Sequence, residues 1–316
     1  MNQKKIRYGI IGVGYLGKFH LKHLLDLKYV NLVGFYDSCI DTANKISVQY
    51  NVQQFESMET LLDQVDAVSI VTPTITHKEI SLLSLKYNCN IFIEKPIADN
   101  VKNAQTILNG VKNNNTIAQV GHIERFNPAF QKYIKDKHSP VFLECHRLSK
   151  FNKRSMDISV VLDLMIHDID LILHVVDSPI KEIIADGINV ISNSIDLANV
   201  KLIFENGCVA NLTASRISSK DMRKMRVFEK NSYTNIDLLQ KSLTKYYTNP
   251  ISKSGEFNFQ IENIKLQEYD ALKKELEYFC ESIISNQKNL NNILNAVEAL
   301  KIAEEINKII TSKIKS

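Results

Sequence analysis

A glycine-rich turn near the start of the chain has the residue types and spacing of a phosphate-binding site. Gly12, Gly14 and Gly17 form a GxGxxG pattern that follows an apolar stretch and opens a helical pattern. The first glycine allows a tight turn, the second lets the backbone approach a pyrophosphate, and the third permits close helix–strand packing. The helix N-terminus adds amide donors and a positive dipole end. The pattern predicts that this turn, with Tyr15 and Leu16, binds a dinucleotide; the alternative is a glycine turn without a ligand.

A carboxylate follows at the position where a dinucleotide would need one. Asp37 lies 25 positions beyond Gly12, at the end of the second predicted strand, where it would bind the ribose hydroxyls of adenosine. It would repel a 2′-phosphate, and Ser38, Cys39 and Ile40 offer no cation to neutralise one. We therefore expect NAD as the cofactor, with NADP as the less favoured alternative.

Two further polar segments follow predicted strands in the first half of the chain. The strand at 67–71 is followed by Thr72, Pro73, Thr74 and His77, and the strand at 91–94 ends in Glu94 and is followed by Lys95. Because ligands bind at the carboxyl ends of parallel strands, we expect all six residues to contribute to the cofactor site. Burial and a nearby nicotinamide cation would lower the pKa of Lys95 and suit it to proton transfer. The alternative is a structural ion pair between Lys95 and Glu94.

A very apolar helical pattern, Val160–Asp177, carries a stripe of polar side chains. Asp163, His167, Asp170 and His174 recur at the spacing of one helix face. Such imidazoles and carboxylates can bind a metal, tie the helix to its neighbours, or act as acids and bases. Because the two histidines lie two turns apart, which spreads them awkwardly for one ion, no metal is expected.

A further set of polar residues joins the two halves of the chain. It comprises His122, Glu124, Arg125 and Asn127, with Arg147 on a following predicted strand. We expect these residues to face the cofactor cleft and to contact the substrate. Arginine binds phosphate oxygens in a bidentate way, so Arg125 and Arg147 are the nearest candidates for a substrate phosphate. The alternative is that both arginines make interdomain ion pairs.

The first 120 residues alternate short apolar strands with helical patterns. This alternation predicts an α/β domain with a doubly wound parallel sheet. The predicted strands are Ile6–Ile11, Asn31–Tyr36, Ala67–Val71, Ile91–Glu94 and Ile117–Val120. The predicted helices are Leu16–Leu27, Thr42–Tyr50, Ser57–Leu62, Lys78–Tyr87 and Val101–Lys112.

The pattern changes after about residue 122. Val200–Glu205 and Cys208–Ser215 flank Asn206-Gly207, the preferred pair for a two-residue hairpin turn. Apolar residues alternate on both stretches, which predicts an open, largely antiparallel sheet with one covered face. Two helical patterns, Leu266–Ser285 and Asn292–Ile310, close the chain. We therefore expect a nucleotide-binding domain at 1–121 and an α+β domain at 122–316.

Composition excludes several classes of function. Among 316 residues, 39 Lys and Arg against 35 Asp and Glu give a net charge of +4, spread along the chain rather than concentrated in a basic patch. Nucleic-acid binding is therefore not expected. No apolar stretch is long enough to cross a membrane. Five well-separated cysteines without a CxxC pair favour reduced thiols in a cytoplasm over a disulfide frame or a zinc site.

Several of these segments together resemble a known family. The turn GVGYLG, the segment TPTITH, the triplet Glu94-Lys95-Pro96 and the later Asp163-Leu-Met-Ile-His167 are similar to the glucose–fructose oxidoreductase/inositol dehydrogenase (Gfo/Idh/MocA) family. The resemblance covers roughly residues 5 to 175. It implies a Rossmann domain followed by an α+β domain whose open sheet often mediates homo-oligomer formation. It also implies an NAD(P)-dependent sugar or cyclitol oxidoreductase in which Lys95, Asp163 and His167 are catalytic.

Two longer segments, 124–128 and 163–170, resemble a branch of this family that acts on nucleotide sugars. The resemblance implies an NAD-dependent oxidation of a sugar secondary alcohol to a ketone, with UDP-N-acetylglucosamine oxidised at C3 as the best guess. Such an enzyme would supply amino sugars for lipid A. A free-sugar or cyclitol dehydrogenase of the same family is one alternative. A non-catalytic dinucleotide-binding regulator is another, although it would have no need of a proton-transfer set.

Overall fold

The chain divides into two units that differ in the kind of sheet they contain. A computed structural model describes residues 5–151, 158–248 and 259–315. The first unit comprises Met1–Ile123 with Asp270–Leu300, and the second comprises Glu124–Tyr269 with Lys301–Ser316. Within the described residues, no helix is both long and apolar enough to cross a membrane.

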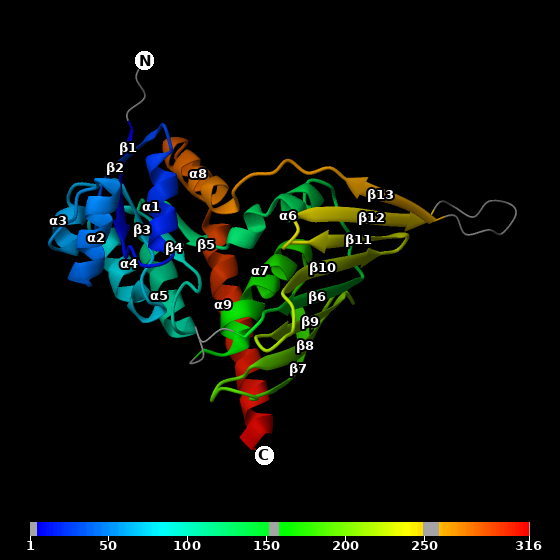
Figure 1. Ribbon diagram of the computed structural model, residues 1–316. Helices are drawn as coiled ribbons and strands as arrows, with labels where there is room; N and C mark the ends of the chain where they lie inside the picture. The colour runs from blue at the N-terminus through cyan, green and yellow to red at the C-terminus, as the bar shows by residue number, and fades with distance from the viewer. Residues whose placement is uncertain (1–4, 152–157, 249–258, 316) are drawn as a thin grey trace, which may run out of the picture. The chain divides into compact units, whose positions relative to one another are not determined.

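The first unit is built on a parallel sheet of five strands (Figure 1). Its strands follow the order β2-β1-β3-β4-β5, so the order reverses between β1 and β3. In sheets of this kind the ligand binds beyond the carboxyl ends of the strands at that reversal. The strands are β1 (Ile6–Ile11), β2 (Val30–Tyr36), β3 (Ala67–Ile70), β4 (Asn90–Glu94) and β5 (Ala118–Gly121). All five predicted strands and the doubly wound fold are confirmed.

Helices connect these strands as the alternating pattern predicts. They are α1 (Gly17–Leu25), α2 (Ile40–Tyr50), α3 (Met58–Leu62), α4 (His77–Lys86) and α5 (Val101–Lys112), with a short 3-10 turn at Thr74–Thr76. Side-chain caps fix some of their starts. Ser57 accepts a hydrogen bond from the Thr60 amide ahead of α3, and Asn100 accepts one from the Asn103 amide ahead of α5.

The end of the chain contributes to the first unit, which differs from the expected division at 121 and 122. Helix α8 (Ala271–Ile284) buries Leu276, Phe279 and Cys280 in the same core as Tyr8 and Phe92. The Phe279 ring meets the Tyr8 and Phe92 rings edge-on, with centroids 6.2 and 5.8 Å apart. Helix α9 (Leu290–Lys315) begins in this unit and ends in the second. The first unit therefore includes α8, because the apolar face of this helix packs into the core of that unit.

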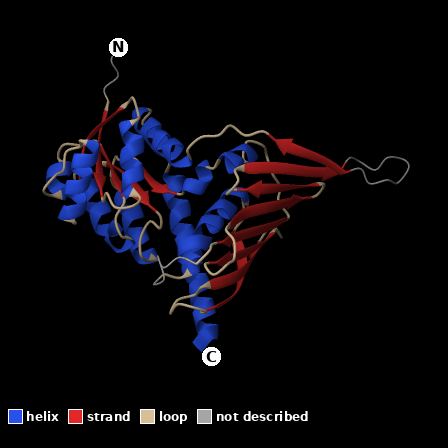
Figure 2. Cartoon of the chain, viewed as in Figure 1, coloured by secondary structure: helices blue, strands red, loops and turns tan. Residues whose placement is uncertain are grey.

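The second unit contains a mixed sheet of eight strands (Figure 2). Its order is β13-β12-β11-β10-β6-β9-β8-β7, and only β6 and β9 pair in parallel. The strands are β6 (Phe142–Leu148), β7 (Ile180–Ile188), β8 (Leu197–Phe204), β9 (Val209–Ser215), β10 (Met222–Glu229), β11 (Ser232–Asp237), β12 (Ser242–Thr248) and β13 (Phe259–Ile264). The predicted open and largely antiparallel sheet is thus confirmed.

One face of this sheet is buried, as the alternation predicts. Val200, Leu202 and Leu212 are fully buried. Helix α6 (Pro128–Tyr133), a π-helix (Val161–Met165) and α7 (Ile166–Val175) lie along that side (Figure 1). A short 3-10 turn, Ile123–Phe126, precedes α6.

The hairpin between β8 and β9 forms with a longer loop than expected. Four residues, 205–208, separate the two strands, and among them Gly207 has a positive φ, at 85°. The Gly207 amide donates to Phe204 O at 3.0 Å, and the Phe204 amide donates to Cys208 O at 2.9 Å. A type I turn followed by a left-handed glycine has this geometry, whereas a two-residue turn of type I′ needs two residues with positive φ.

Candidate active site

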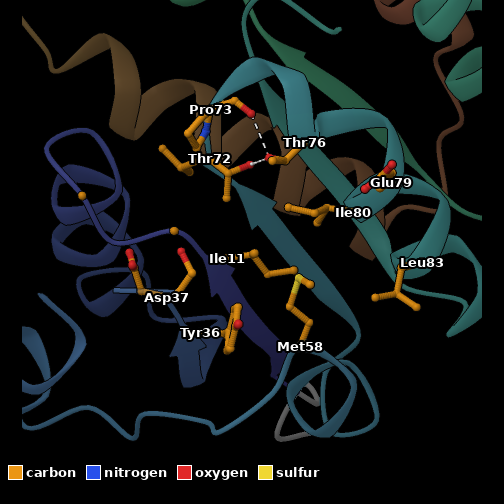
Figure 3. A pocket seen from close by; sticks show the side chains of 14 residues that line it. Ile11, Tyr36, Asp37, Met58, Thr72, Pro73, Thr76, Glu79, Ile80 and Leu83 are labelled. Carbon is orange, nitrogen blue, oxygen red and sulfur yellow. Dashed lines mark hydrogen bonds between the residues drawn. The ribbon is translucent and has the colours of Figure 1, made fainter. Parts of the chain in front are cut away.

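A cavity of about 560 Å³ lies where the glycine turn meets the ends of β2 and β3 (Figure 3). Five residues of the predicted cofactor site line it, namely Gly12, Gly14, Asp37, Thr72 and Pro73. The sequence did not single out its other walls, which include Tyr36, Met58, Val71, Glu79, Ile80 and Leu83. Ile80 and Leu83 lie one turn apart on α4, so their helical spacing was the one available signal.

The surroundings of the three glycines of the turn differ in whether they would leave room for a side chain. Gly12 has φ +91°, and a Cβ there would overlap Val71 O. A Cβ on Gly17 would overlap Gly12 O, so the turn can close only with a glycine at position 17. A Cβ on Gly14 would meet no atom within 4 Å. Since no protein atom requires a glycine at this position, the space beside Gly14 is available to a ligand.

Asp37 holds the glycine turn against the end of β2. Its Oδ2 accepts a hydrogen bond from the Val13 amide at 2.8 Å, and its Oδ1 accepts one from the Cys39 amide at 2.9 Å. Each carboxylate oxygen has two lone pairs, so both retain capacity to accept a ribose hydroxyl. The side chain is half-buried and lines the cavity.

We expect Asp37→Ala to narrow the preference for NAD over NADP, because the carboxylate favours the ribose hydroxyls and repels a 2′-phosphate. Calorimetric titration of both cofactors into the wild type and the variant measures this. Asp41→Ala, which removes a nearby exposed carboxylate on α2, is the matched control. A wild type that binds NADP more tightly than NAD would contradict the expectation.

His77 holds two loops together instead of lining the cavity. Its Nε2 lies 2.9 Å from Thr72 O and its Nδ1 lies 3.0 Å from Pro96 O. Burial lowers the pKa of the His77 imidazole, although both carbonyl oxygens oppose that shift. His77 is 1% exposed and bridges the ends of β3 and β4, so its predicted part in the cofactor site would be to position these two loops. Tyr15, Leu16 and Thr74 lie at or near the surface of neighbouring loops.

Glu94 is fixed by a histidine that the sequence did not single out. Its Oε1 lies 2.9 Å from His20 Nε2, and its Oε2 accepts a hydrogen bond from the Lys95 amide at 3.2 Å. Burial raises the pKa of Glu94, but the hydrogen bond and charge of His20 outweigh it, so the net shift is downward. His20 also meets Ser69 Oγ at 3.2 Å. The signal was a histidine on the buried face of α1; the half-buried Lys95 follows Glu94 directly.

The predicted substrate residues of the second unit form a buried ion-pair network. Arg147 donates from Nε and Nη2 to Asp168, at 3.1 and 2.8 Å, and from Nη1 to Glu124 at 2.8 Å. Arg125 makes a bidentate pair with Asp170, at 2.7 and 2.5 Å. The expected alternative of ion pairs is therefore present, but each pair lies within one unit instead of between domains.

The network explains the charge states of its carboxylates. Burial raises the pKa of Asp168, against the opposing charge of Arg147. Burial also acts to raise the pKa of Glu124, but the charge and hydrogen bond of Arg147 outweigh it, so that pKa is lowered. Asn127 donates to Glu124 Oε2 at 3.2 Å and to Leu238 O at 2.8 Å. His122 is buried at the end of the first unit.

The helix that carries His167 is not one continuous α-helix, as the sequence had suggested. Residues Val161–Met165 form a π-helix, and α7 begins at Ile166. Asp163 therefore lies on the π-helix and His167 on the first turn of α7, so α-helical spacing no longer relates them. Asp170 is 1% exposed and paired, so it does not belong to an open polar stripe. Within the described ranges, no group of three or more His, Cys, Asp or Glu side chains could hold a metal.

Two family models match successive parts of the chain. Residues 6–122 match the model of an oxidoreductase family with an NAD-binding Rossmann fold, and residues 119–231 match the GFO/IDH/MocA C-terminal domain. UDP-N-acetylglucosamine 3-dehydrogenase of Acidithiobacillus ferrooxidans is 34% identical over 284 residues, covering 89% of this chain and 90% of its own length.

Solved structures extend the likeness to nearly the whole chain. A structure of the Acidithiobacillus ferrooxidans enzyme superposes with a TM-score of 0.91 at 30% identity, covering 98% of this chain and 99% of its own. Myo-inositol 2-dehydrogenase from Lactobacillus plantarum superposes with a TM-score of 0.82 at 20% identity, covering 98% of each chain. The second comparison shows the fold alone.

Proposed function

This chain belongs to the Gfo/Idh/MocA family of NAD-binding oxidoreductases, and we propose that it oxidises a secondary alcohol of a nucleotide sugar to a ketone. The best candidate is UDP-N-acetylglucosamine, oxidised at C3. One observation carries the proposal: a relative named for this reaction is 34% identical over 89% of the chain. The cavity beside Gly12 and Gly14 supplies the matching place for a dinucleotide.

Oxidation of a secondary alcohol needs a hydride acceptor and a base. The cavity lined by Gly12, Gly14 and Asp37 would hold NAD, which would supply the hydride acceptor for the carbon that carries the hydroxyl. His167 takes the hydroxyl proton, Lys95 polarises the oxygen or relays the proton, and Asp163 orients the substrate or the imidazole. Two features support these roles. Lys95 follows the half-buried Glu94 at the carboxyl end of β4, and His167 is half-buried beside the paired Asp168.

Formation of NADH with a panel of sugars tests the reaction. We expect turnover with UDP-N-acetylglucosamine and none with free N-acetylglucosamine. Turnover of free sugars or of inositols, without preference for a UDP group, would instead support a free-sugar or cyclitol dehydrogenase. The chain is 23% identical to a relative of that kind, the scyllo-inositol 2-dehydrogenase (NAD(+)) of Bacillus subtilis. NAD binding without turnover of any of these compounds would favour a non-catalytic regulator.

The open face of the eight-stranded sheet is the proposed site of homo-oligomer formation. A row of aromatic rings crosses four of its strands, with Phe142, Phe228, Tyr233 and Tyr246 in contact in that order. Ile261, on β13, lies directly opposite Tyr246 in the strand pair and is 62% exposed. A second copy of this face would cover the apolar row.

The five cysteines are free thiols, which supports a cytoplasmic location.

Tyr246→Lys is expected to shift the chain toward the monomer, because it buries a charge in the proposed interface. Light scattering coupled to size-exclusion chromatography measures the mass. Lys201→Gln, on the same face but away from the aromatic row, is the control. A monomeric wild type would contradict the proposal.

A further inference from the structure

One arginine of the second unit, Arg223, joins the buried ion-pair network through a single ion-pair contact, with Glu124, within the described residues. Arg223, near the start of β10, contacts Glu124 Oε1 through Nη1 at 3.5 Å, which is longer than a hydrogen bond. Its side chain is 50% exposed, whereas that of Arg147 is 3% exposed. The Glu124 carboxylate therefore attracts the Arg223 guanidinium without binding it tightly, and half of the side-chain surface stays in contact with solvent.

Strand pairing places this guanidinium next to the network that supports His167. Arg223 lies directly opposite Arg147 in the antiparallel pair of β10 and β6. Met225 and Val227, which share its side of β10, are buried on the helix-covered face of the sheet. Arg147 in turn binds Asp168, the residue after His167. Arg223 is thus an exposed cation near the start of β10, on the helix-covered side of the sheet, and α7 on that side carries the proposed base.

The partners of the arginines decide which of them is available to an anion. Withdrawing Arg125 or Arg147 toward a ligand would leave Asp170, or Asp168 and Glu124, buried without a cation, which is costly. Withdrawing Arg223 leaves no such carboxylate, because Glu124 keeps its hydrogen bonds from Arg147 and Asn127. The geometry therefore favours Arg223 over the two arginines that the sequence suggested.

We propose that Arg223 binds a phosphate group of the substrate and thereby selects a nucleoside-diphosphate sugar over a free sugar. The proposal rests on the proposed function, because it assigns the diphosphate of that substrate to a named residue. A guanidinium presents a planar fork of donors that matches phosphate oxygens and keeps its charge at every relevant pH. Arg125 and Arg147 hold the surrounding elements in place instead of contacting the diphosphate.

The test compares Arg223→Gln with Lys224→Gln. Lys224 is the next residue on the same strand, faces the opposite side of the sheet, is 41% exposed and pairs with Asp237 at 3.3 Å, so its removal matches the loss of charge. Calorimetry with UDP alone and the KM for UDP-N-acetylglucosamine are measured for both. We expect Arg223→Gln to weaken UDP binding and to raise the KM by at least about tenfold each, which corresponds to the loss of one charge-assisted hydrogen bond. Its kcat should stay within about threefold of wild type. Lys224→Gln is expected to match wild type.

A second variant and the salt dependence keep the result interpretable. Arg223→Lys retains the charge but loses the fork, so its KM should lie between those of wild type and Arg223→Gln. Added salt should weaken UDP binding in wild type more than in Arg223→Gln. Unchanged UDP affinity and KM in Arg223→Gln would overturn the proposal while leaving the reaction intact. UDP binding that depends on Arg223, without oxidation of any UDP-sugar, would retain the phosphate site and overturn the proposed function. A wild type that neither binds UDP nor oxidises a UDP-sugar would overturn both.

Discussion

His167→Ala and Lys95→Ala should each lower kcat for the oxidised sugar by about 10²–10⁴, the usual contribution of a positioned acid or base. His167 belongs to the second unit, so its loss should leave NAD affinity nearly unchanged. Lys95 follows the strand end of the nucleotide-binding unit, so its variant should also be titrated with NAD. Initial rates of NADH formation at saturating substrate measure kcat, and calorimetry measures NAD affinity.

His174→Gln is the matched control for His167. Both histidines lie on α7, but His174 is an exposed residue near its end, with its ring 5.9 Å from that of Phe130. Its replacement should leave kcat within about threefold of wild type, because it removes no proposed acid or base. Wild-type turnover in both His167→Ala and Lys95→Ala would remove the assigned catalytic roles.

The second large effect concerns stability. Arg147→Met should lower the free energy of unfolding by about 3–5 kcal/mol, because it leaves Asp168 and Glu124 buried without their shared cation. Both carboxylates are less than one-tenth exposed, at 4% and 6%. The change should also loosen α7, so kcat should fall along with stability. Denaturant unfolding followed by circular dichroism measures the free energy.

An exposed pair of the same type provides the control for Arg147. Arg7 makes a hydrogen-bonded pair with Asp66, at 2.7 Å, but the two side chains are 46% and 33% exposed. Arg7→Met should therefore cost at most about 1 kcal/mol. If Arg147→Met and Arg7→Met cost the same, burial of the network does not contribute as described.

Adding Asp168→Asn to Arg147→Met should recover part of the loss, because it removes one unpaired buried charge. Further destabilisation of that double variant would point instead to a packing role of the Arg147 stem.

The sequence determined the strands, helices and glycine turn of the first 121 residues, whereas the packing of α8 into the same unit came only from the structure. Five apolar strands, the intervening helices and the GxGxxG turn are each marked by the pattern of neighbouring residues, so local patterns sufficed to place them. Gly12 and Gly17 illustrate this, because the backbone conformation and close packing that they permit follow from a tight strand-to-helix turn. The same holds for the alternation that buries Val200 and Leu212 on one face of the second sheet.

Tertiary structure alone decided how the polar residues are used. Arg147 and Asp168 are 21 residues apart in the chain, and Arg125 and Asp170 are 45 apart, so no spacing rule could pair them. A charged side chain at a buried position must find a counter-ion, and only the packed structure shows which one it finds. The same reason places both ring nitrogens of His77 against backbone carbonyls and leaves Arg223, which no motif marked, exposed at the edge of the network. The pattern of neighbouring residues predicts the helices and strands, because each of them forms from a continuous stretch of chain. The roles of the polar side chains depend on burial and on partners far away in the sequence, which only the packed structure shows.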